Sequence, residues 1–521
     1  MSSNAENNKR IAKNTLMLYF RMLVMMAVSL YTSRVVLDTL GVSDYGIYNV
    51  VGGFVTMFSL ISGAMTAATQ RFLSFAIGEG KTKEVTSVFS TAVIIHIGLA
   101  FIVLIAGETI GVWFVANKMN FPPGRYIAAI WVFEFSLLTF LVSVINVPYN
   151  AAIIAYEKMS AFAYISIVEV VLKLLIVYLL LITPFDRLIF YAILMALVQI
   201  LIQFIYATYT HRKIKTCHCN WKLNHDYFKQ MSSFVSWNLI GSLAGVCKDQ
   251  GLNVVLNIFF GTAVNAARGV AMQVSSAINR FVTNFQVAMN PQIIKLYAAD
   301  ERKEMFKLVF RGSRFSYLLL LCLSLPVVIE APFILNIWLV KVPDYTVPFL
   351  RLIIFTALID SLSNTLITSM HASGKVRDYQ IVVGGLSLLT LPLAYLLLKL
   401  GYSPISALAA SLFISVVCLF ARVALLSRTI DFPAISFLRK VALRMLILTI
   451  ASYIVPLAVY RFTSVNWMTF IMVCIVSLIS GLIFSYYMGM EKHEREVIIS
   501  KVKEKFNKKG QGDRYLDPYI I

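Results

Sequence analysis

About fourteen apolar runs, each of roughly 20 residues, follow one another along this chain and are separated by short polar stretches. A helix rises about 1.5 Å per residue, so each run is long enough to cross the roughly 30 Å hydrocarbon core of a bilayer. Backbone polar groups cannot stay unpaired in lipid, and no alternating pattern typical of a barrel is present. The sequence therefore predicts an all-α polytopic membrane protein with about 14 transmembrane helices.

The composition agrees with this prediction. Of the 521 residues, 59% are hydrophobic and 14% are charged, whereas soluble domains are about 45–50% apolar and about 25% charged. These values exclude a soluble globular enzyme, a disordered chain and a fibrous protein. No loop exceeds about 30 residues, which is too short for a separate catalytic domain. Any function must therefore lie among the helices or on short loops.

The distribution of Lys and Arg predicts the orientation of the chain. The net charge is +20, but the basic residues lie in loops and in the tail, which argues against nucleic acid as a partner. With the N-terminus placed in the cytoplasm, cytoplasmic segments carry more basic residues than outer ones by about four to one. We therefore expect both termini to be cytoplasmic. The six cysteines fall mostly inside apolar runs and indicate no disulfide framework.

Two regions share the same order of sequence features, which indicates an internal repeat. Residues 70–89 and 291–310 each follow a span, cross a short charged loop and begin the next span with Val-Phe, and Gly41 and Gly261 precede them at a similar offset. A parallel repeat of six spans would give two lobes related by an axis along the membrane normal. We expect an N-terminal lobe at 1–210 (spans 1–6), a C-terminal lobe at 211–430 (spans 7–12), extra spans 13 and 14 at 431–488, and a cytoplasmic basic tail at 489–521.

The tail places Ile498, Val502 and Phe506 at spacings of i, i+4 and i+8 among lysines. This pattern predicts an amphipathic helix on the anionic inner leaflet. A plain solvated helix is the alternative.

Three stretches carry a resemblance to a known family: SRVVLDTLGVSDYGIYNVV (33–51), TAATQRFLSFAIGEGK (66–81) and NRFVTNFQVAMNPQIIKLYA (279–298). They resemble bacterial polysaccharide-repeat flippases (Wzx-type) of the multidrug/oligosaccharidyl-lipid/polysaccharide exporter (MOP) superfamily. The resemblance covers essentially the whole chain. It implies two six-helix lobes around a central cavity and transport by alternating access. Flippase branches of this superfamily typically have fourteen spans and the drug-exporting branch twelve, so the span count favours a flippase.

The resemblance also implies a function. The chain would flip a lipid-linked oligosaccharide, with undecaprenyl pyrophosphate as the expected carrier, across the bacterial inner membrane for surface polysaccharide biosynthesis. Its partners would be this substrate, membrane lipids and a coupling H⁺ or Na⁺ ion. No enzymatic activity and no cofactor are expected, and no nucleotide-binding motif is present.

Charged residues inside the spans are candidates for the transport site, since each costs roughly 2.5–3.5 kcal/mol on insertion scales and should face a cavity or a partner. Arg21, Lys248 and Arg280 lie near mid-depth, while Arg268 and Arg34 lie nearer the outer ends. We expect these five cations to line the central cavity and to hold the phosphates of an anionic substrate. For Arg34 and Arg268 the alternative is snorkelling to the membrane interface.

The acidic residues inside spans have two interpretations. Asp249 is expected to pair with Arg280 or Arg21, as a static lock or as a gate, because its neighbour Lys248 points about 100° away on a helix. Glu134 and Asp360 are candidates for ion coupling, with a structural hydrogen bond as the alternative. Glu169 and Lys173 are spaced i, i+4 and are expected to form a structural pair.

The loop from His211 to His225 also contains Cys217, His218 and Cys219. These residue types suit zinc, but their spacing is not that of a standard zinc finger. We expect a solvated basic loop and no metal.

Two other functions compete with a flippase. A cation-coupled multidrug exporter of the same superfamily predicts a cavity dominated by acids, and the central cations argue against it. A membrane sugar polymerase or acyltransferase predicts a large outer loop or intramembrane His and Asp placed for acid–base chemistry. His96 is the one histidine inside a span, and the outer loops are short.

Overall fold

The computed structural model describes residues 2–56, 59–118, 124–339, 342–462, 466–492 and 494–496. In these ranges every regular element is helical, which confirms the predicted fold class. The first half of the chain forms α1 (Ser2–Thr56), α2 (Ser59–Gly78), α3 (Thr82–Ala106), the π-helix η1 (Gly107–Gly111), α4 (Val112–Lys118), α5 (Tyr126–Ala155), α6 (Met159–Ile182) and α7 (Arg187–Lys213). The second half forms α8 (His225–Phe260), α9 (Thr262–Ala298), α10 (Arg302–Ile329), α11 (Ala331–Trp338), α12 (Thr346–Ser373), α13 (Val376–Leu388), α14 (Thr390–Lys399) and α15 (Ile405–Ile430). The last elements are α16 (Ala434–Phe437), η2 (Leu438–Leu443), α17 (Arg444–Phe462), α18 (Trp467–Phe484) and η3 (Ser485–Gly489).

Membrane-length segments account for almost the whole described chain. Ten of them are long and apolar enough to cross a membrane, from Thr82–Val115 to Trp467–Gly489. The remaining long helices are α1, α2, α8 and α9, which are 55, 20, 36 and 37 residues long. The kink at Gly41 divides α1, so that α1 and α2 together form two crossings. With α8, α9 and the ten apolar segments, the described chain contains fourteen segments of membrane length.

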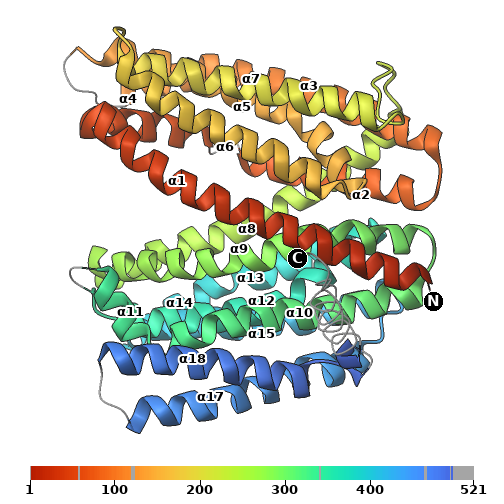
Figure 1. Ribbon diagram of the computed structural model, residues 1–521, viewed down its shortest axis with the longest axis vertical. Coiled ribbons are helices and arrows are strands. Elements are labelled where there is room, and N and C mark those ends of the chain that lie inside the picture. Colours follow the sequence, from red (N-terminus) through yellow and green to blue (C-terminus); the bar gives the residue numbers. More distant parts are fainter. Residues whose placement is uncertain are drawn as a thin grey trace, which may run out of the picture.

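The helices form two lobes that lie one above the other in Figure 1. Helices α1 to α7 form the upper lobe, α8 to α15 form the lower one, and α17 and α18 pack against the outer flank of the lower lobe through α10. The axes of the long helices are roughly parallel, and successive helices cross in opposite directions (Figure 1). The side on which the N-terminus lies is called the proximal side below, and the opposite side is the distal side.

The backbone carries the same unusual turns in both lobes. Gly41 (φ 76°, ψ 166°) and Gly261 (φ 75°, ψ −167°) separate consecutive helices on the distal side, and they are 220 residues apart. Gly80 (φ 72°) and Asp300 (φ 58°) occupy the proximal turns that follow, again 220 residues apart. Glycine adopts such positive φ values more readily than other residues, because it has no Cβ atom. Both pairs of turns therefore have the same separation along the chain.

Most residues of the segment from His211 to His225, which contains the loop between α7 and α8, are exposed, as the sequence predicts, but the loop is also anchored to the first lobe. Cys217 is fully buried, and the loop backbone is tied to α3 because Thr86 Oγ1 donates to the carbonyl oxygen of Thr216 at 2.7 Å and Ser90 Oγ donates to that of His218 at 3.3 Å. The buried Cys217 and these two hydrogen bonds anchor the middle of the loop, while its basic residues remain exposed. Among the described residues, no group of three or more His, Cys, Asp and Glu could hold a metal ion. The predicted tail helix, with Ile498, Val502 and Phe506, lies outside the described residues.

Reporter fusions test the orientation. Lys118 ends α4 on the distal side and Lys215 follows α7 on the proximal side. Since basic residues favour the cytoplasm, a fusion after Lys215 is expected to report the cytoplasm and one after Lys118 the outer side. The reverse result would invert the orientation, and the same side for both would contradict the path of α5 to α7.

Candidate functional site

A cavity lies between the two lobes and is walled by α1 and α9. Its lining residues are Arg21, Met22, Met25, Met26 and Ser29 from α1, and Arg280, Thr283 and Asn284 from α9, and its volume is about 390 Å³. The two arginines face this cavity from opposite lobes. Three methionines supply an unbranched, adaptable apolar wall. No carboxylate is present among these lining residues.

Neither arginine of this cavity is neutralised by an ion pair within the described residues. The Arg21 guanidinium lies 4.3 Å from the ring centroid of Phe162, and its buried Nε has no hydrogen-bond partner among the residues that the structure describes. Arg280 is exposed to the cavity. A buried donor without a partner is unfavourable unless a ligand or water supplies an acceptor. The cavity is therefore suited to an anion.

The lobes meet just proximal to this cavity. Tyr19 of α1 packs against Phe281 of α9 with ring centroids 5.9 Å apart, and Asn284 Nδ2 lies 3.1 Å from Met22 Sδ. Further toward the proximal side, Phe75 of α2 contacts Tyr297 of α9 with centroids 6.5 Å apart. These contacts separate the cavity from the proximal side.

A buried carboxylate stabilises the contact between the two lobes on the proximal side. Glu157 lies in the turn after α5, in a left-handed conformation (φ 58°), and its side chain is only 2% exposed. Lys295 Nζ lies 2.6 Å from Glu157 Oε1, and Gln292 Nε2 donates to Oε2 at 2.5 Å. Asn14 Nδ2 donates to the carbonyl oxygen of Glu157 at 3.3 Å. One residue of the first lobe thus holds α9 of the second.

Arg71 of α2 forms a second contact between the lobes on the proximal side. Its Nε and Nη2 donate to the carbonyl oxygens of His371 and Ala372, at 3.1 and 3.3 Å, where α12 ends. The guanidinium also lies over the ring of Phe72, 4.4 Å from its centroid. A cation is well placed at a helix C-terminus because unpaired carbonyl groups give that end a partial negative charge. Two independent contacts therefore close the proximal side.

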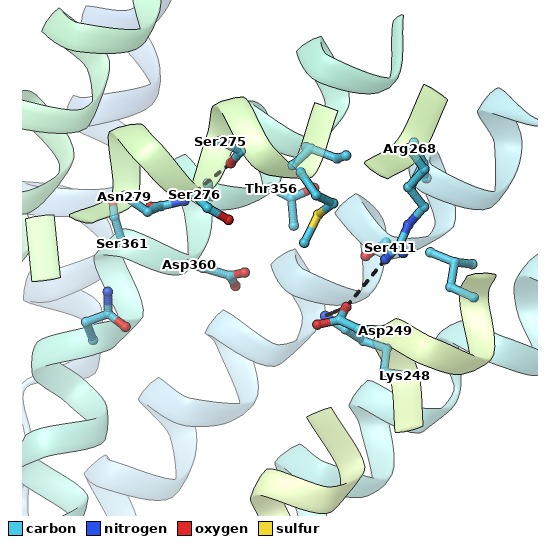
Figure 2. Close-up of a pocket in the computed structure, with 16 residues that line it drawn as sticks. Lys248, Asp249, Arg268, Ser275, Ser276, Asn279, Thr356, Asp360, Ser361 and Ser411 are labelled. Carbon is cyan, nitrogen blue, oxygen red and sulfur yellow. Dashed lines mark hydrogen bonds and ion pairs between the residues drawn. The ribbon is translucent and has the colours of Figure 1, made fainter. Parts of the chain in front are cut away.

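A second polar cavity lies inside the lower lobe, and Figure 2 shows its lining side chains. It has a volume of about 210 Å³ and is lined by Lys248 and Asp249 of α8, Arg268 of α9 and Asp360 of α12, together with a ring of serines and Asn279. Asp249 Oδ1 lies 3.7 Å from Arg268 Nη2 and 3.9 Å from Lys248 Nζ. Arg268 also donates to Asn253 Oδ1. Acid and base are balanced here, unlike the interlobe cavity.

A neighbouring cavity of about 220 Å³ continues this polar region toward α15. Lys248 and Asp360 line both cavities, and Arg422 lines the second. Arg422 donates to Tyr379 Oη and Ser363 Oγ, both at 3.1 Å. Asp360 lines this cavity together with Lys248, Arg422 and Ser415. The lower lobe therefore contains a carboxylate held among cations and hydroxyls.

The structure separates the predicted cations into two groups. Arg21 and Arg280 line the interlobe cavity, whereas Lys248 and Arg268 line the cavity inside the lower lobe. The expected pairing of Asp249 with Arg280 or Arg21 is wrong. Arg268 and Arg280 are twelve residues apart, or about 18 Å along α9, so Asp249 reaches the former and not the latter. Lys248, which we expected to point away from Asp249, reaches it through its long side chain.

The other predicted residues lie outside both cavities. Glu134 lies on α5 and lines neither of these cavities. Lys173 Nζ lies 2.5 Å from Glu169 Oε1, and the pair lies on α6. The side chain of Arg34 is outside the described residues.

Sequence reasoning missed three important residues. Arg422 is not among the candidate residues singled out from the sequence, and it lies within α15. Glu157 and Arg71 stand near helix ends and resemble ordinary loop charges in the sequence. The available signal for Arg422 was the cluster of polar residues in ALIDSLSNTLITSM (357–370), which indicates a polar face on α12 in need of partners.

Comparison with known proteins identifies the fold. No protein-family model matches the chain, and no curated protein matches its sequence. Solved structures do match. The Vibrio cholerae MATE transporter VcmN in the bent form has a TM-score of 0.68 and 18% identity over 84% of this chain and 99% of its own. The structure of an outward-facing conformation of a multidrug resistance MATE family transporter of the MOP superfamily has a TM-score of 0.69 and 11% identity. The match covers 80% of this chain and 94% of that one.

A third match is the MATE transporter ClbM in complex with Rb⁺, with a TM-score of 0.66 and 14% identity over 80% of this chain and 94% of that one. The chain therefore has the fold of MATE transporters. The matches span nearly all of those proteins and leave about a fifth of this chain uncovered.

Proposed function

We propose that this protein is a secondary transporter that moves an anionic amphiphile between the lobes by alternating access. Its fold is that of MATE transporters. The interlobe cavity is closed on the proximal side by the contacts of Glu157 and Arg71. In this proposal the proximal side faces the cytoplasm, and the described state receives or releases substrate on the distal side. A rocking motion that breaks these contacts would reverse the access.

The proposed substrate class rests on the two arginines that form no ion pair within the described residues. Arg21 and Arg280 face one cavity from opposite lobes with no lining carboxylate. A guanidinium binds phosphate oxygens with paired donors, so two of them suit a pyrophosphate. A lipid-linked oligosaccharide combines such a group with an apolar tail that can remain in the bilayer. We infer that a substrate of this kind is translocated.

The extra helices support a flippase. The matched transporters are covered almost completely, while about a fifth of this chain extends beyond them. Helices α17 and α18 lie outside the two lobes. By the family resemblance, two spans beyond twelve are typical of the flippase branches.

Multidrug export is the second candidate function. One of the matched structures is of a multidrug resistance transporter, and this observation favours export of drugs at least as much as flipping of lipids. The methionine wall of the interlobe cavity also suits varied apolar ligands. For either function, our candidate for the coupling-ion site is Asp360. Its cavity is also lined by Lys248, Arg422 and Ser415.

A transport assay in vesicles separates the two candidates. The purified protein is reconstituted and offered a fluorescent undecaprenyl-pyrophosphate-linked sugar or, in parallel, a lipophilic cationic dye. The parent is expected to translocate the lipid-linked anion. Arg21→Ala and Arg280→Ala should each reduce its rate about 10- to 100-fold, since a charged hydrogen bond contributes about 1.5–3 kcal/mol.

Lys248→Ala is the matched comparison, because this variant removes a mid-depth cation from the other cavity. It is expected to retain binding of the anion. If Lys248→Ala alone abolishes binding, the substrate site lies inside the lower lobe and the interlobe proposal is wrong. Transport of the dye, with no transport of the lipid-linked sugar, would establish the multidrug exporter instead.

A further inference from the structure

A basic pocket lies far from the transport path, at the proximal end of the two extra spans. It is formed between η2 with the start of α17 on one side and the end of η3 on the other, and its volume is about 600 Å³. Its cations are Arg439, Lys440 and Arg444, and its one carboxylate is Glu491. Leu443, Ile447 and Met488 supply its apolar lining.

The π-helical turn η2 concentrates these cations on one face. Hydrogen bonds in a π-helix run from residue i to residue i+5, so residues four and five apart lie on neighbouring turns. Arg439 and Lys440 in η2 and Arg444 at the start of α17 therefore lie on neighbouring turns, and all three line the pocket. Arg444 is held in place because its Nη2 donates to the carbonyl oxygen of Met490 at 3.1 Å, across the pocket.

The charge of the pocket is not balanced. Glu491 is held by Arg314, whose Nη1 donates to Glu491 Oε1 at 2.8 Å. Arg314, which is 4% exposed, also binds Glu494 at 2.9 Å. Within the described part of the chain, Arg439 and Lys440 form no ion pair. Both are exposed at the rim, so the pocket presents two free cations to its surroundings.

The same helix face continues as a stripe of exposed apolar side chains. Leu443, Leu446, Ile447, Ile450 and Ile454 are between 48% and 61% exposed, at the helical spacing of one face. In a membrane this stripe must contact lipid tails. Arg439 and Lys440 lie about one turn before Leu443, and Arg444 directly follows it. These cations are therefore at the proximal end of the stripe, where we expect the lipid headgroups, and Lys and Arg are favoured at that depth.

We propose that this pocket, bounded by Arg439, Lys440 and Arg444, binds the phosphate headgroup of an anionic phospholipid whose tails lie along α17. A lipid placed in this way satisfies the unpaired cations and covers the apolar stripe at the same time. A soluble anion would satisfy the cations alone. The inference does not depend on the transported substrate, because the pocket lies on the outer flank of the second lobe.

Retention of lipid by the purified protein tests this site. The full chain in detergent is exposed to dioleoyl-phosphatidylglycerol, and to dioleoyl-phosphatidylcholine, which has the same tails and no net charge. Native mass spectrometry counts the bound lipid. The parent is expected to retain phosphatidylglycerol more strongly. The double variant Arg439→Gln/Lys440→Gln should lose about 10- to 30-fold in affinity for it, since each basic residue near an anionic lipid contributes about 1 kcal/mol.

The matched control is Lys399→Gln/Arg461→Gln, which removes two exposed charges from the distal ends of α14 and α17. It should retain lipid as the parent does. Equal retention of both lipids by the parent, or unchanged retention by the Arg439/Lys440 variant, would overturn the proposal. So would displacement of the lipid by millimolar glycerol phosphate, which would indicate a site for a free phosphate. A melting temperature equal to that of the parent in lipid-free detergent shows that the double variant is folded.

Discussion

Replacing Lys295 with methionine is expected to shift the two lobes toward a state that is open on the proximal side, by about 100-fold. The substitution removes the ammonium group that lies 2.6 Å from the carboxylate of Glu157, whose side chain is 2% exposed. Removal of one partner from a buried ion pair costs about 3–5 kcal/mol. Opening of the lobes would hydrate Glu157 and relieve this cost. Gln292 still donates to the carboxylate, so the lower end of the range applies.

The distance between spin labels reports this shift directly. Labels at Lys81 and Glu301 lie in the proximal turns of the upper and lower lobes, respectively. Their separation should increase in Lys295→Met. The control Lys307→Met removes the same charge from the same side, from an exposed pair with Glu304 that is expected to contribute little. An unchanged separation in Lys295→Met would show that this ion pair does not hold the lobes together.

The sequence predicts the fold well because lipid imposes a simple rule on it. Each crossing needs a helix of about 20 apolar residues, and that rule holds whatever the helix contacts. Gly41 and Gly261, from which the repeat is predicted, both lie in distal turns with positive φ. The path of the chain through the membrane can thus be derived without any knowledge of packing.

The candidate site is predicted only in part, because the depth of a residue does not fix the direction in which its side chain points. Arg21, Lys248 and Arg280 are all near mid-depth. Only Arg21 and Arg280 face the gap between the lobes, while Lys248 faces into its own lobe toward Asp360. The direction depends on the rotation of α8 about its axis, which is set by packing against α13 and α14. No local pattern in the sequence encodes that rotation.

The closure of the lobes is harder still to predict from sequence. Glu157 meets Lys295 across 138 residues, and Arg71 meets His371 across 300. Each residue is an ordinary charge near a helix end until the two lobes are brought together. One clue is the glycine at position 78, where the charged turn of the first repeat begins.

Gly78→Val is expected to open the proximal side by a steric route that is independent of charge. A Cβ atom at Gly78 would lie 2.7 Å from the carbonyl oxygen and 2.8 Å from the Cα of Lys295, and both are backbone atoms of α9. No change of rotamer can relieve such contacts, so α2 and α9 must move apart. Overpacking of this kind typically costs about 1–3 kcal/mol, which corresponds to roughly a 5- to 150-fold shift.

Gly63→Val is the matched control, since it lies on the same helix and a Cβ there meets nothing within 4 Å. The measurement is the affinity for a ligand supplied from the distal side. When the binding-competent state is only a fraction of the population, the apparent dissociation constant rises by the inverse of that fraction. Gly78→Val should therefore weaken distal binding and lengthen the Lys81–Glu301 separation together, although it touches no residue of the interlobe cavity. Weaker binding at an unchanged separation would mean that the substitution acts within one lobe, and that the contact of α2 with α9 is not the closure that gates access.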